Sequence, residues 1–447
     1  MKRSLSYVLL LCFIIIHGPA AAEDRILNVG YWNERSEVSQ NILQKYPSLH
    51  IIGGDMTAGT TDELISQFLT KEFSYDVFPL FSIQYDIQPL IEKGYLADLS
   101  GSDEVRDIVS KMKSDIVSMV SKGSGIYALP YGLETEFLSI QPEAWKNAGF
   151  KTEEIPDTFD AFLFFLDSWC KKPVPGFCVM GQFDETMYTE NSYTQWLLEL
   201  LFENYLMQYR YLDKTITFDD LSLKKQMEHC IATGKALYQI EKIPNHGYAL
   251  LENRCSGVND IKNLVSLRMN DEQPKLIKAY LWMVAVNADS TVQDLAVDFA
   301  IHVFNMDPSI LALLYQDPHS ILNPNYNDTL IEYQNAIKEL ENKLVIDNLS
   351  TERKLELQNI IDEYRVELED YKDEKNKYYV TDLQIKEILD CIDGIFIETP
   401  GPLSVGSEYG PYLNQMIASY AAGLSSTDQM ISKLDEICWM IQMEEGL

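Results

Sequence analysis

The fold of this 447-residue chain is organised around one stretch, Ala128-Leu129-Pro130-Tyr131-Gly132-Leu133-Glu134-Thr135-Glu136-Phe137-Leu138-Ser139. It reads as an extended run that is interrupted where Pro130 removes a backbone donor and Gly132 relaxes the backbone. We therefore expect a strand that changes direction as it crosses from one lobe to another. A turn and a helix start follow at 156–162, with Thr158 as the helix cap.

Strand and helix patterns alternate in the part of the chain that precedes this stretch. We expect buried strands at 26–32, 49–52 and 75–80, with helices at 37–46 and 61–71 between them. Such alternation is typical of a parallel sheet in an α/β lobe. Polar residues that follow the strands should then gather at the carboxyl ends of the strands, where open α/β sheets bind ligands.

The chain downstream predicts a second lobe and a second crossing. Helical patterns occupy much of 133–280, and we interpret 221–240 as a helix pair. An apolar strand that ends in a polar turn then appears at 280–290, and an amphipathic run follows at 292–305. The second lobe is therefore expected to be mostly helical around a small sheet.

These segments resemble the extracellular solute-binding proteins of carbohydrate ABC importers, the maltose-binding-like group. The resemblance rests on 128–139 with Trp145-Lys146-Asn147-Ala148-Gly149-Phe150 after it, on the second crossing at 280–290, and on the terminal helix 426–443. It covers roughly 26–150, 280–310 and 400–445. It implies an α/β, two-lobe periplasmic-binding-protein-like fold of type II, with an interlobe cleft and a hinge at the two crossings.

A helical hairpin is predicted within this framework by two heptad patterns. Apolar residues recur at three- and four-residue steps in two runs, at Leu330, Tyr333, Ile337, Leu340 and Leu344, and at Leu357, Ile361, Tyr364, Leu368 and Tyr371. Asp347-Asn348-Leu349-Ser350 supplies turn and cap chemistry between them. We expect an inserted antiparallel hairpin at 325–378 whose seams pack on each other or on the lobes.

These patterns divide the chain into six parts. The parts are a signal peptide at 1–22, the first part of lobe 1 at 23–131, lobe 2 at 132–283, the return to lobe 1 at 284–324, the hairpin insertion at 325–378, and a C-terminal helical segment that closes the lobes at 379–447.

The first residues predict secretion. Lys2 and Arg3 precede a short apolar run, and a small-residue cleavage site ends at Ala22. The apolar run is too short for a confident membrane span. Cys12 lies inside it after Leu11, whereas a lipoprotein signal has a small residue before the cysteine, so we do not expect lipid anchoring. The mature chain is expected in the periplasm or outside the cell.

The net charge, the histidines and the cysteines argue against nucleic acid, metal and cofactor binding. A formal net charge of -32 repels phosphate backbones, so we expect no nucleic-acid binding. The histidines lack metal-ligand spacing and no CxxC is present, so we expect no metal and no cofactor. Whether disulfides form is left open for the six cysteines that follow the leader, Cys170, Cys178, Cys230, Cys255, Cys391 and Cys438.

Candidate ligand residues are those that suit a sugar. Sugar sites combine aromatic rings that stack on a pyranose with carboxylates, amides and arginines that bond its hydroxyls. The chain has such groups where the fold would place its cleft. They are Trp32, Asn33, Glu34 and Arg35 after the first strand, Ser82, Tyr85 and Asp86 after the strand near residue 80, Tyr131, Glu134 and Glu136 at the first crossing, Trp282 from the second lobe, and Tyr409 from a Gly- and Pro-rich connection that we expect at 395–411.

The functional prediction is binding without catalysis. The resemblance implies a monomer that captures a carbohydrate by hinge closure and passes it to the membrane permease subunits of an ABC importer. Two other classes stay open: a secreted glycan-active enzyme that uses paired carboxylates, and an interaction protein that uses the hairpin. The solute itself is not defined, since peptides, polyamines and polyols also suit these groups.

Overall fold

The structure is a computed structural model that describes residues 25–180, 189–212, 214–241, 248–255, 258–304, 311–323, 326–345, 350–400 and 410–444. The expected signal peptide at 1–22 and the candidate Tyr409 lie outside these residues. Contacts divide the chain into two compact units, Met1–Tyr131 with Trp282–Met306 and Gly132–Leu281 with Asp307–Leu447. Within the described ranges, no helix has the length and apolar character needed to cross a membrane.

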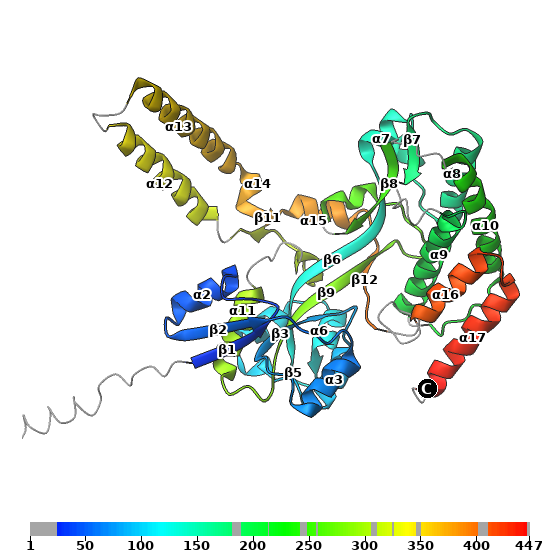
Figure 1. The fold of residues 1–447 in the computed structure, drawn as a ribbon, viewed down its shortest axis with the longest axis horizontal. Helices are drawn as coiled ribbons and strands as arrows, with labels where there is room; N and C mark the ends of the chain where they lie inside the picture. The colour runs from blue at the N-terminus through cyan, green and yellow to red at the C-terminus, as the bar shows by residue number, and fades with distance from the viewer. Residues whose placement is uncertain are drawn as a thin grey trace, which may run out of the picture. The chain divides into compact units, whose positions relative to one another are not determined.

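Parallel strands form the centre of the first unit (Figure 1). Strand β1 (Arg25–Gly30) pairs in parallel with β2 (Leu49–Gly54) and with β3 (Val77–Phe81). Helices α2 (Glu37–Lys45) and α3 (Thr61–Thr70) connect these strands, and side-chain caps start both helices. The predicted alternation of strands and helices is confirmed.

Shorter elements and one returning helix complete this unit. They are α4 (Ile87–Glu92), α5 (Asp103–Ser110), α6 (Ser114–Val120), the ribbon of β4 (Ser121–Lys122) with β5 (Gly125–Ile126), and α11 (Gln293–Phe304). Helix α11 packs against α2, although the two are far apart in sequence (Figure 1).

Two long strands, β6 (Ala128–Ile140) and β9 (Leu276–Val286), run from one unit into the other. In β6, half-buried and buried residues alternate beyond Gly132, but Tyr131 and Gly132 are both half-buried. Residues 128–130 are all buried, so the alternation begins at Gly132, the position where the sequence predicts a change of direction. The last part of β9 belongs to the first unit, where it pairs antiparallel with β3 and aligns Trp282 with Phe81.

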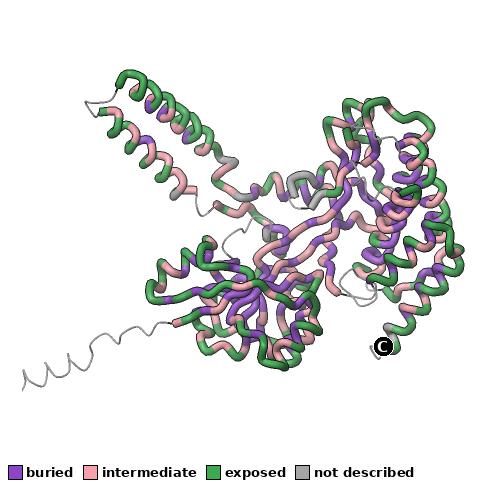
Figure 2. Tube along the Cα trace, in the orientation of Figure 1, coloured by how far each residue is buried: buried purple, intermediate pink, exposed green. Residues whose placement is uncertain are grey.

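The second unit combines the remaining strands with a large helical layer. Strand β6 pairs with β8 (Tyr248–Cys255), and β8 pairs with β7 (Phe177–Met180). The helices of this layer are α7 (Pro142–Asn147), α8 (Phe159–Lys171), α9 (Ser192–Tyr211), α10 (Leu221–Glu241), α16 (Gly410–Ala421) and α17 (Thr427–Glu444). Their apolar faces form one core in which α9 packs against α10 and α16, and Figure 2 shows the buried residues gathered there.

Two expectations for this unit are corrected. The run 221–240 is one continuous helix, α10, which no proline interrupts. Gly234 lies inside this helix, where a Cβ would come 2.6 Å from Thr194 Cα, so the glycine permits close packing against α9 and does not end the helix. The segment after Ile395 was expected to be a connection, but β12 (Gly394–Ile397) is a strand that pairs in parallel with β9. Pairing with β9 supplies hydrogen bonds for this short apolar run.

The helical hairpin is confirmed. Helices α12 (Tyr326–Leu344) and α13 (Thr351–Tyr371) pack along the predicted apolar seam, with Ile361 buried at its centre (Figure 1). Ser350 caps α13 by accepting a hydrogen bond from Arg353 N at 3.2 Å. After it come α14 (Glu374–Lys377), β11 (Tyr378–Val380), which pairs antiparallel with β10 (Ile321–Leu322), and α15 (Asp382–Leu389).

Four of the cysteines whose side chains the structure describes are free thiols. They are Cys170, Cys230, Cys391 and Cys438. Burial raises the pKa of Cys170 and of Cys178 to about 11, which keeps both in the unreactive thiol form.

Candidate functional site

Six aromatic side chains form a cluster in the first unit. Ring centroids lie 5.9 Å apart for Trp32 and Tyr131, 6.0 Å for Tyr131 and Trp282, and 4.9 Å for Trp282 and Phe81. The members of this aromatic cluster are Tyr31, Trp32, Phe81, Tyr131, Trp282 and Phe299. Three sequence candidates, Trp32, Tyr131 and Trp282, are thus brought together from three separate segments.

The backbone at the end of β1 presents one ring of this cluster to solvent. Tyr31 has a φ of 73°, in the left-handed region that non-glycine residues rarely adopt. Its N–H donates to Gly54 O at 2.7 Å, which holds the turn. A Cβ on Gly53 would lie 2.2 Å from Trp32 O, so the close approach of β2 requires glycine. As a result, Tyr31 remains 58% exposed while Trp32 is only 8% exposed.

Tyr131 carries a polar atom that the cluster does not satisfy. Its hydroxyl is buried and has no hydrogen-bond partner among the described residues. Burial, and to a lesser degree the nearby Tyr31, raises the pKa of Tyr131 above its usual value. The phenol therefore stays neutral and can donate one hydrogen bond.

The polar candidates after β1 lie on the surface. Asn33, Glu34 and Arg35 are exposed. Asn33 Oδ1 accepts a hydrogen bond from Arg35 N at 2.9 Å, and Glu34 O accepts one from Gln40 Nε2 at 2.6 Å. These contacts hold the turn and leave the Glu34 and Arg35 side chains facing solvent.

The three candidates after β3 are engaged in the fold. Ser82 is buried, and Tyr85 is buried and donates its hydroxyl to Ala58 O at 2.5 Å. Asp86 caps α4 by accepting from Gln88 N at 3.0 Å, and burial raises its pKa. These contacts give each of the two ionisable candidates, Tyr85 and Asp86, a structural partner.

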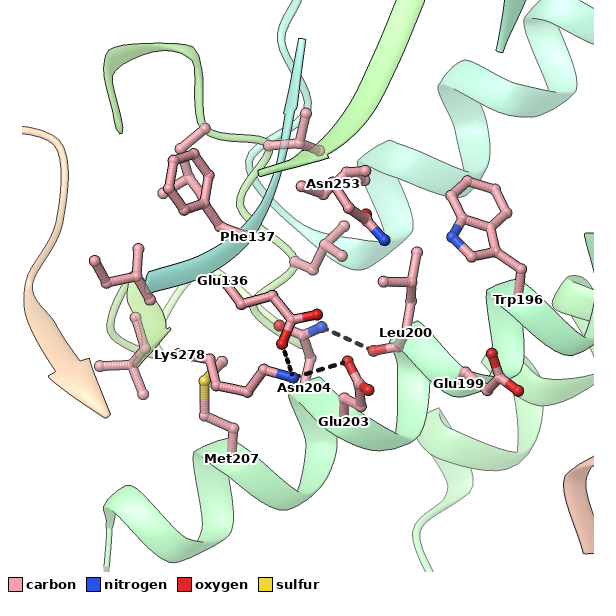
Figure 3. Close-up of a pocket in the computed structure, with 16 residues that line it drawn as sticks. Glu136, Phe137, Trp196, Glu199, Leu200, Glu203, Asn204, Met207, Asn253 and Lys278 are labelled. Atoms are coloured by element: carbon pink, nitrogen blue, oxygen red, sulfur yellow. Dashed lines mark hydrogen bonds and ion pairs between the residues drawn. The ribbon is translucent and has the colours of Figure 1, made fainter. Parts of the chain in front are cut away.

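Glu136 lines a pocket inside the second unit, between β6, β9 and α9. The pocket holds about 740 Å³ of empty space, its open mouth included. Polar and aromatic side chains project into it, namely Glu136, Trp196, Glu199, Glu203, Asn253 and Lys278 (Figure 3). We call this space the carboxylate pocket.

Lys278 organises the charges of the carboxylate pocket. Its Nζ lies 2.8 Å from Glu136 Oε2, 3.6 Å from Glu203 Oε2 and 3.9 Å from Glu398 Oε2. Glu136 also accepts a hydrogen bond from the hydroxyl of Tyr280. The lysine side chain is only 15% exposed, so these charges interact through a medium that screens them less than water does.

The carboxylates of this group differ in their ionisation. Burial alone would raise the pKa of Glu136, but Lys278 and Tyr280 lower it below its usual value. Burial raises the pKa of Glu398, against the opposing effect of Lys278 and Arg210. Burial likewise raises the pKa of Glu203, and Lys278 opposes that effect. Lys278 therefore neutralises Glu136 most effectively.

Glu136 is the one member of this charged group that is a candidate from the sequence alone. Lys278, Tyr280 and Trp282 lie two residues apart on β9 and therefore share one face of the strand. This two-residue period of polar and aromatic side chains is visible in the sequence and could have identified Lys278 and Tyr280. Glu203 lies on α9, and Glu398 follows β12, which sequence reasoning took for a connection. Glu134 is half-buried on the same face of β6 as Glu136.

Among the described residues, no group of three or more His, Cys, Asp or Glu side chains is arranged to hold a metal ion.

Comparisons with known proteins identify the fold. No family model matches the chain, and no curated protein matches its sequence. A solved structure from work on xylan utilization by the thermophilic bacterium Caldanaerobius polysaccharolyticus is 14% identical with a TM-score of 0.52, over 92% of this chain and 99% of that one.

Two further solved structures are similar over most of their length. An ABC transporter solute-binding protein from Agrobacterium vitis with bound D-mannitol is 13% identical with a TM-score of 0.50, over 94% of this chain and 99% of that one. Maltose-bound MalE3 of T. maritima is 12% identical with a TM-score of 0.50, over 93% of this chain and 99% of that one. The chain therefore has the two-lobe fold of type II periplasmic binding proteins.

Proposed function

We propose that this chain is an extracytoplasmic solute-binding protein that captures a sugar or oligosaccharide and delivers it to the permease of an ABC importer. Its fold is that of solved solute-binding proteins, one of which holds D-mannitol and another maltose. The observation that carries the proposal is the aromatic cluster, in which a left-handed backbone presents the exposed ring of Tyr31. Exposed aromatic faces stack on the apolar side of a sugar ring.

Carboxylates on the crossing strand add the polar half of a sugar site. Glu134 is half-buried on β6. An ionised carboxylate accepts charge-assisted hydrogen bonds from sugar hydroxyls. Tyr131, three residues earlier, offers its unpartnered hydroxyl as a donor.

The proposed mechanism is capture by hinge closure, without turnover. The chain changes units at Tyr131 and Gly132 in β6, and at Leu281 and Trp282 in β9. Backbone rotation at two such strand positions is the hinge motion by which ligands select a closed state. The closed, loaded monomer is then the form that the permease subunits recognise.

A fluorescence titration tests this proposal. The chain is titrated with a panel of neutral oligosaccharides and polyols, and the intrinsic tryptophan fluorescence, to which Trp32 and Trp282 of the aromatic cluster contribute, is recorded. The proposal predicts saturable binding of at least one sugar. Tyr31→Ala should weaken that binding about tenfold, which corresponds to the loss of one aromatic stacking contact.

Two controls complete the experiment. Tyr248→Ala removes a 76% exposed tyrosine of β8, away from the aromatic cluster, and should leave the affinity unchanged. Glu134→Gln should weaken binding by a similar factor to Tyr31→Ala, since it removes the charge from the acceptor. Equal affinity of wild type, Tyr31→Ala and Glu134→Gln would refute the site. Chromatography of the recovered sugar should show no cleavage, and hydrolysis would favour a glycan-active enzyme.

A further inference from the structure

The carboxylate pocket carries more negative charge than its cations neutralise. Four carboxylates line it and the smaller space that adjoins it beside α16, namely Glu136, Glu199, Glu203 and Glu398. Their cationic neighbours in the two lining sets are Lys278 and Arg210. Excess negative charge in a partly desolvated space is costly unless a cation or a proton joins it.

The geometry shows which carboxylates lack a close cation. Lys278 Nζ lies at hydrogen-bonding distance from Glu136, but its distances of 3.6 Å to Glu203 and 3.9 Å to Glu398 exceed those of a charge-assisted hydrogen bond. Arg210 donates through one nitrogen to Thr399 O at 2.8 Å and to Thr399 Oγ1 at 2.9 Å. Glu203 and Glu398 are thus the carboxylates on which a further cation would act.

Two buried polar atoms point independently to a ligand. Glu398 is 9% exposed, and its Oε2 accepts no hydrogen bond from the described residues. Trp196 is 7% exposed, and its indole N–H has no acceptor among the described residues. Figure 3 shows the indole nitrogen on the side of the ring that faces Leu200 and the interior of the pocket. A buried donor without an acceptor costs free energy that a ligand oxygen would restore.

We propose that the carboxylate pocket binds a protonated amino group of a hydroxylated solute, so that the solute class is amino sugars. This inference rests on the proposed function and narrows it. The ammonium group is held by Glu203 with its neighbouring carboxylates, while a hydroxyl oxygen accepts the indole N–H of Trp196. Asn253, also in the lining, provides an amide for a second hydroxyl.

Other ligand classes fit these groups less well. An anionic solute would meet the excess of carboxylates and be repelled. A metal ion lacks a suitable group of ligands in the described part of the chain. A neutral sugar satisfies the indole donor but leaves the charge of Glu203 and Glu398 without a counterion.

Paired ligands that differ at one group test the inference. The full chain is titrated by calorimetry at pH 7 with glucosamine and glucose, and with chitosan and chitin oligosaccharides of equal length. The amine of each pair should bind about 10- to 100-fold more tightly, the range expected for a hydrogen bond to a charged group. Glu203→Gln should remove most of this preference.

Matched variants test whether the preference for the amine arises in the carboxylate pocket or from the overall negative charge of the protein. Glu387→Gln removes an exposed glutamate of α15 and should keep the preference for the amine. Trp196→Phe keeps the aromatic ring but removes the indole donor, and it should weaken both members of each pair. Glu203 lies on the open side of the pocket with its side chain 47% exposed, so its amide variant is expected to fold.

The possible results distinguish failure of the amino-sugar inference from failure of the proposed function. Equal binding of the amine and its neutral partner overturns the amino-sugar inference and leaves the proposed function intact. A preference that survives Glu203→Gln overturns the assignment to this pocket. Failure of every neutral and amino ligand to bind overturns the proposed function together with the inference.

Discussion

Replacement of Lys278 by methionine tests the electrostatic account of the second unit. The lysine side chain is 15% exposed, and its Nζ lies 2.8 Å from Glu136 Oε2 and within 4 Å of Glu203 and Glu398. Methionine keeps the aliphatic volume but leaves these carboxylates without their shared cation. Breaking a buried ion pair by removal of one partner costs about 3 to 5 kcal/mol. Because Glu136 and Glu203 stay partly exposed, we expect about 3 kcal/mol at pH 7.5.

The destabilisation should depend on pH in a defined direction. In the variant, burial raises the pKa of Glu136 and of Glu398 above the value in the unfolded chain, since Lys278 no longer opposes it. A carboxyl with a raised folded pKa loses stability as pH rises through that pKa. The difference from wild type should therefore be largest at pH 7.5 and smaller at pH 4, where the carboxyls of the variant take up protons while Glu136 of the wild type, whose pKa is lowered, begins to lose its ion pair.

Urea unfolding at pH 7.5 and at pH 4, followed by tryptophan fluorescence, measures this difference. Lys225→Met removes an exposed lysine from α10 in the same unit and should leave the urea midpoint nearly unchanged at both pH values. A destabilisation of less than about 1 kcal/mol by Lys278→Met at pH 7.5, or an equal effect at both pH values, would show that Lys278 does not neutralise these carboxylates as described.

Three further variants test other parts of the structure. Tyr131→Phe removes a buried hydroxyl without a partner in the described residues, so thermal unfolding should show no loss of stability, whereas a titration should show weaker sugar binding. Ile361→Ala should destabilise the hairpin by about 2 to 4 kcal/mol in helix-monitored unfolding, while Val366→Ala at a 63% exposed site should have little effect. Gly53→Ala should lower the melting temperature, since its Cβ would lie 2.2 Å from Trp32 O, and an unchanged melting temperature would contradict the packing described.

The helix cap and the hairpin could be predicted because they depend on residues that lie close together in the sequence. The expected cap at Thr158 is present, since its Oγ1 accepts from Ala161 N at 3.2 Å. The heptad pattern predicted the hairpin because its two helices bury each other's seam, with Ile337 and Ile361 at the centre. Caps and seams depend on residues three to seven positions apart, which a single sequence displays directly.

The charged group around Lys278 depends on the pairing of strands that are far apart in the sequence, which the sequence does not display. Glu398 reaches Lys278 because β12 aligns with β9, and these strands are separated by more than a hundred residues. A short apolar run next to glycine and proline gave a weak strand signal, and the parallel partner determined the outcome. Glu136 was a candidate from its place at the crossing, but its ion pair with Lys278 required the tertiary fold.

Calorimetric titration of the chain with neutral and amino sugars, followed by recovery of the ligand, tests whether the protein binds a sugar without turnover. We expect saturable binding with one ligand per chain and recovery of the ligand without chemical change. Absence of binding to every sugar, or cleavage of a sugar that binds, would contradict this expectation.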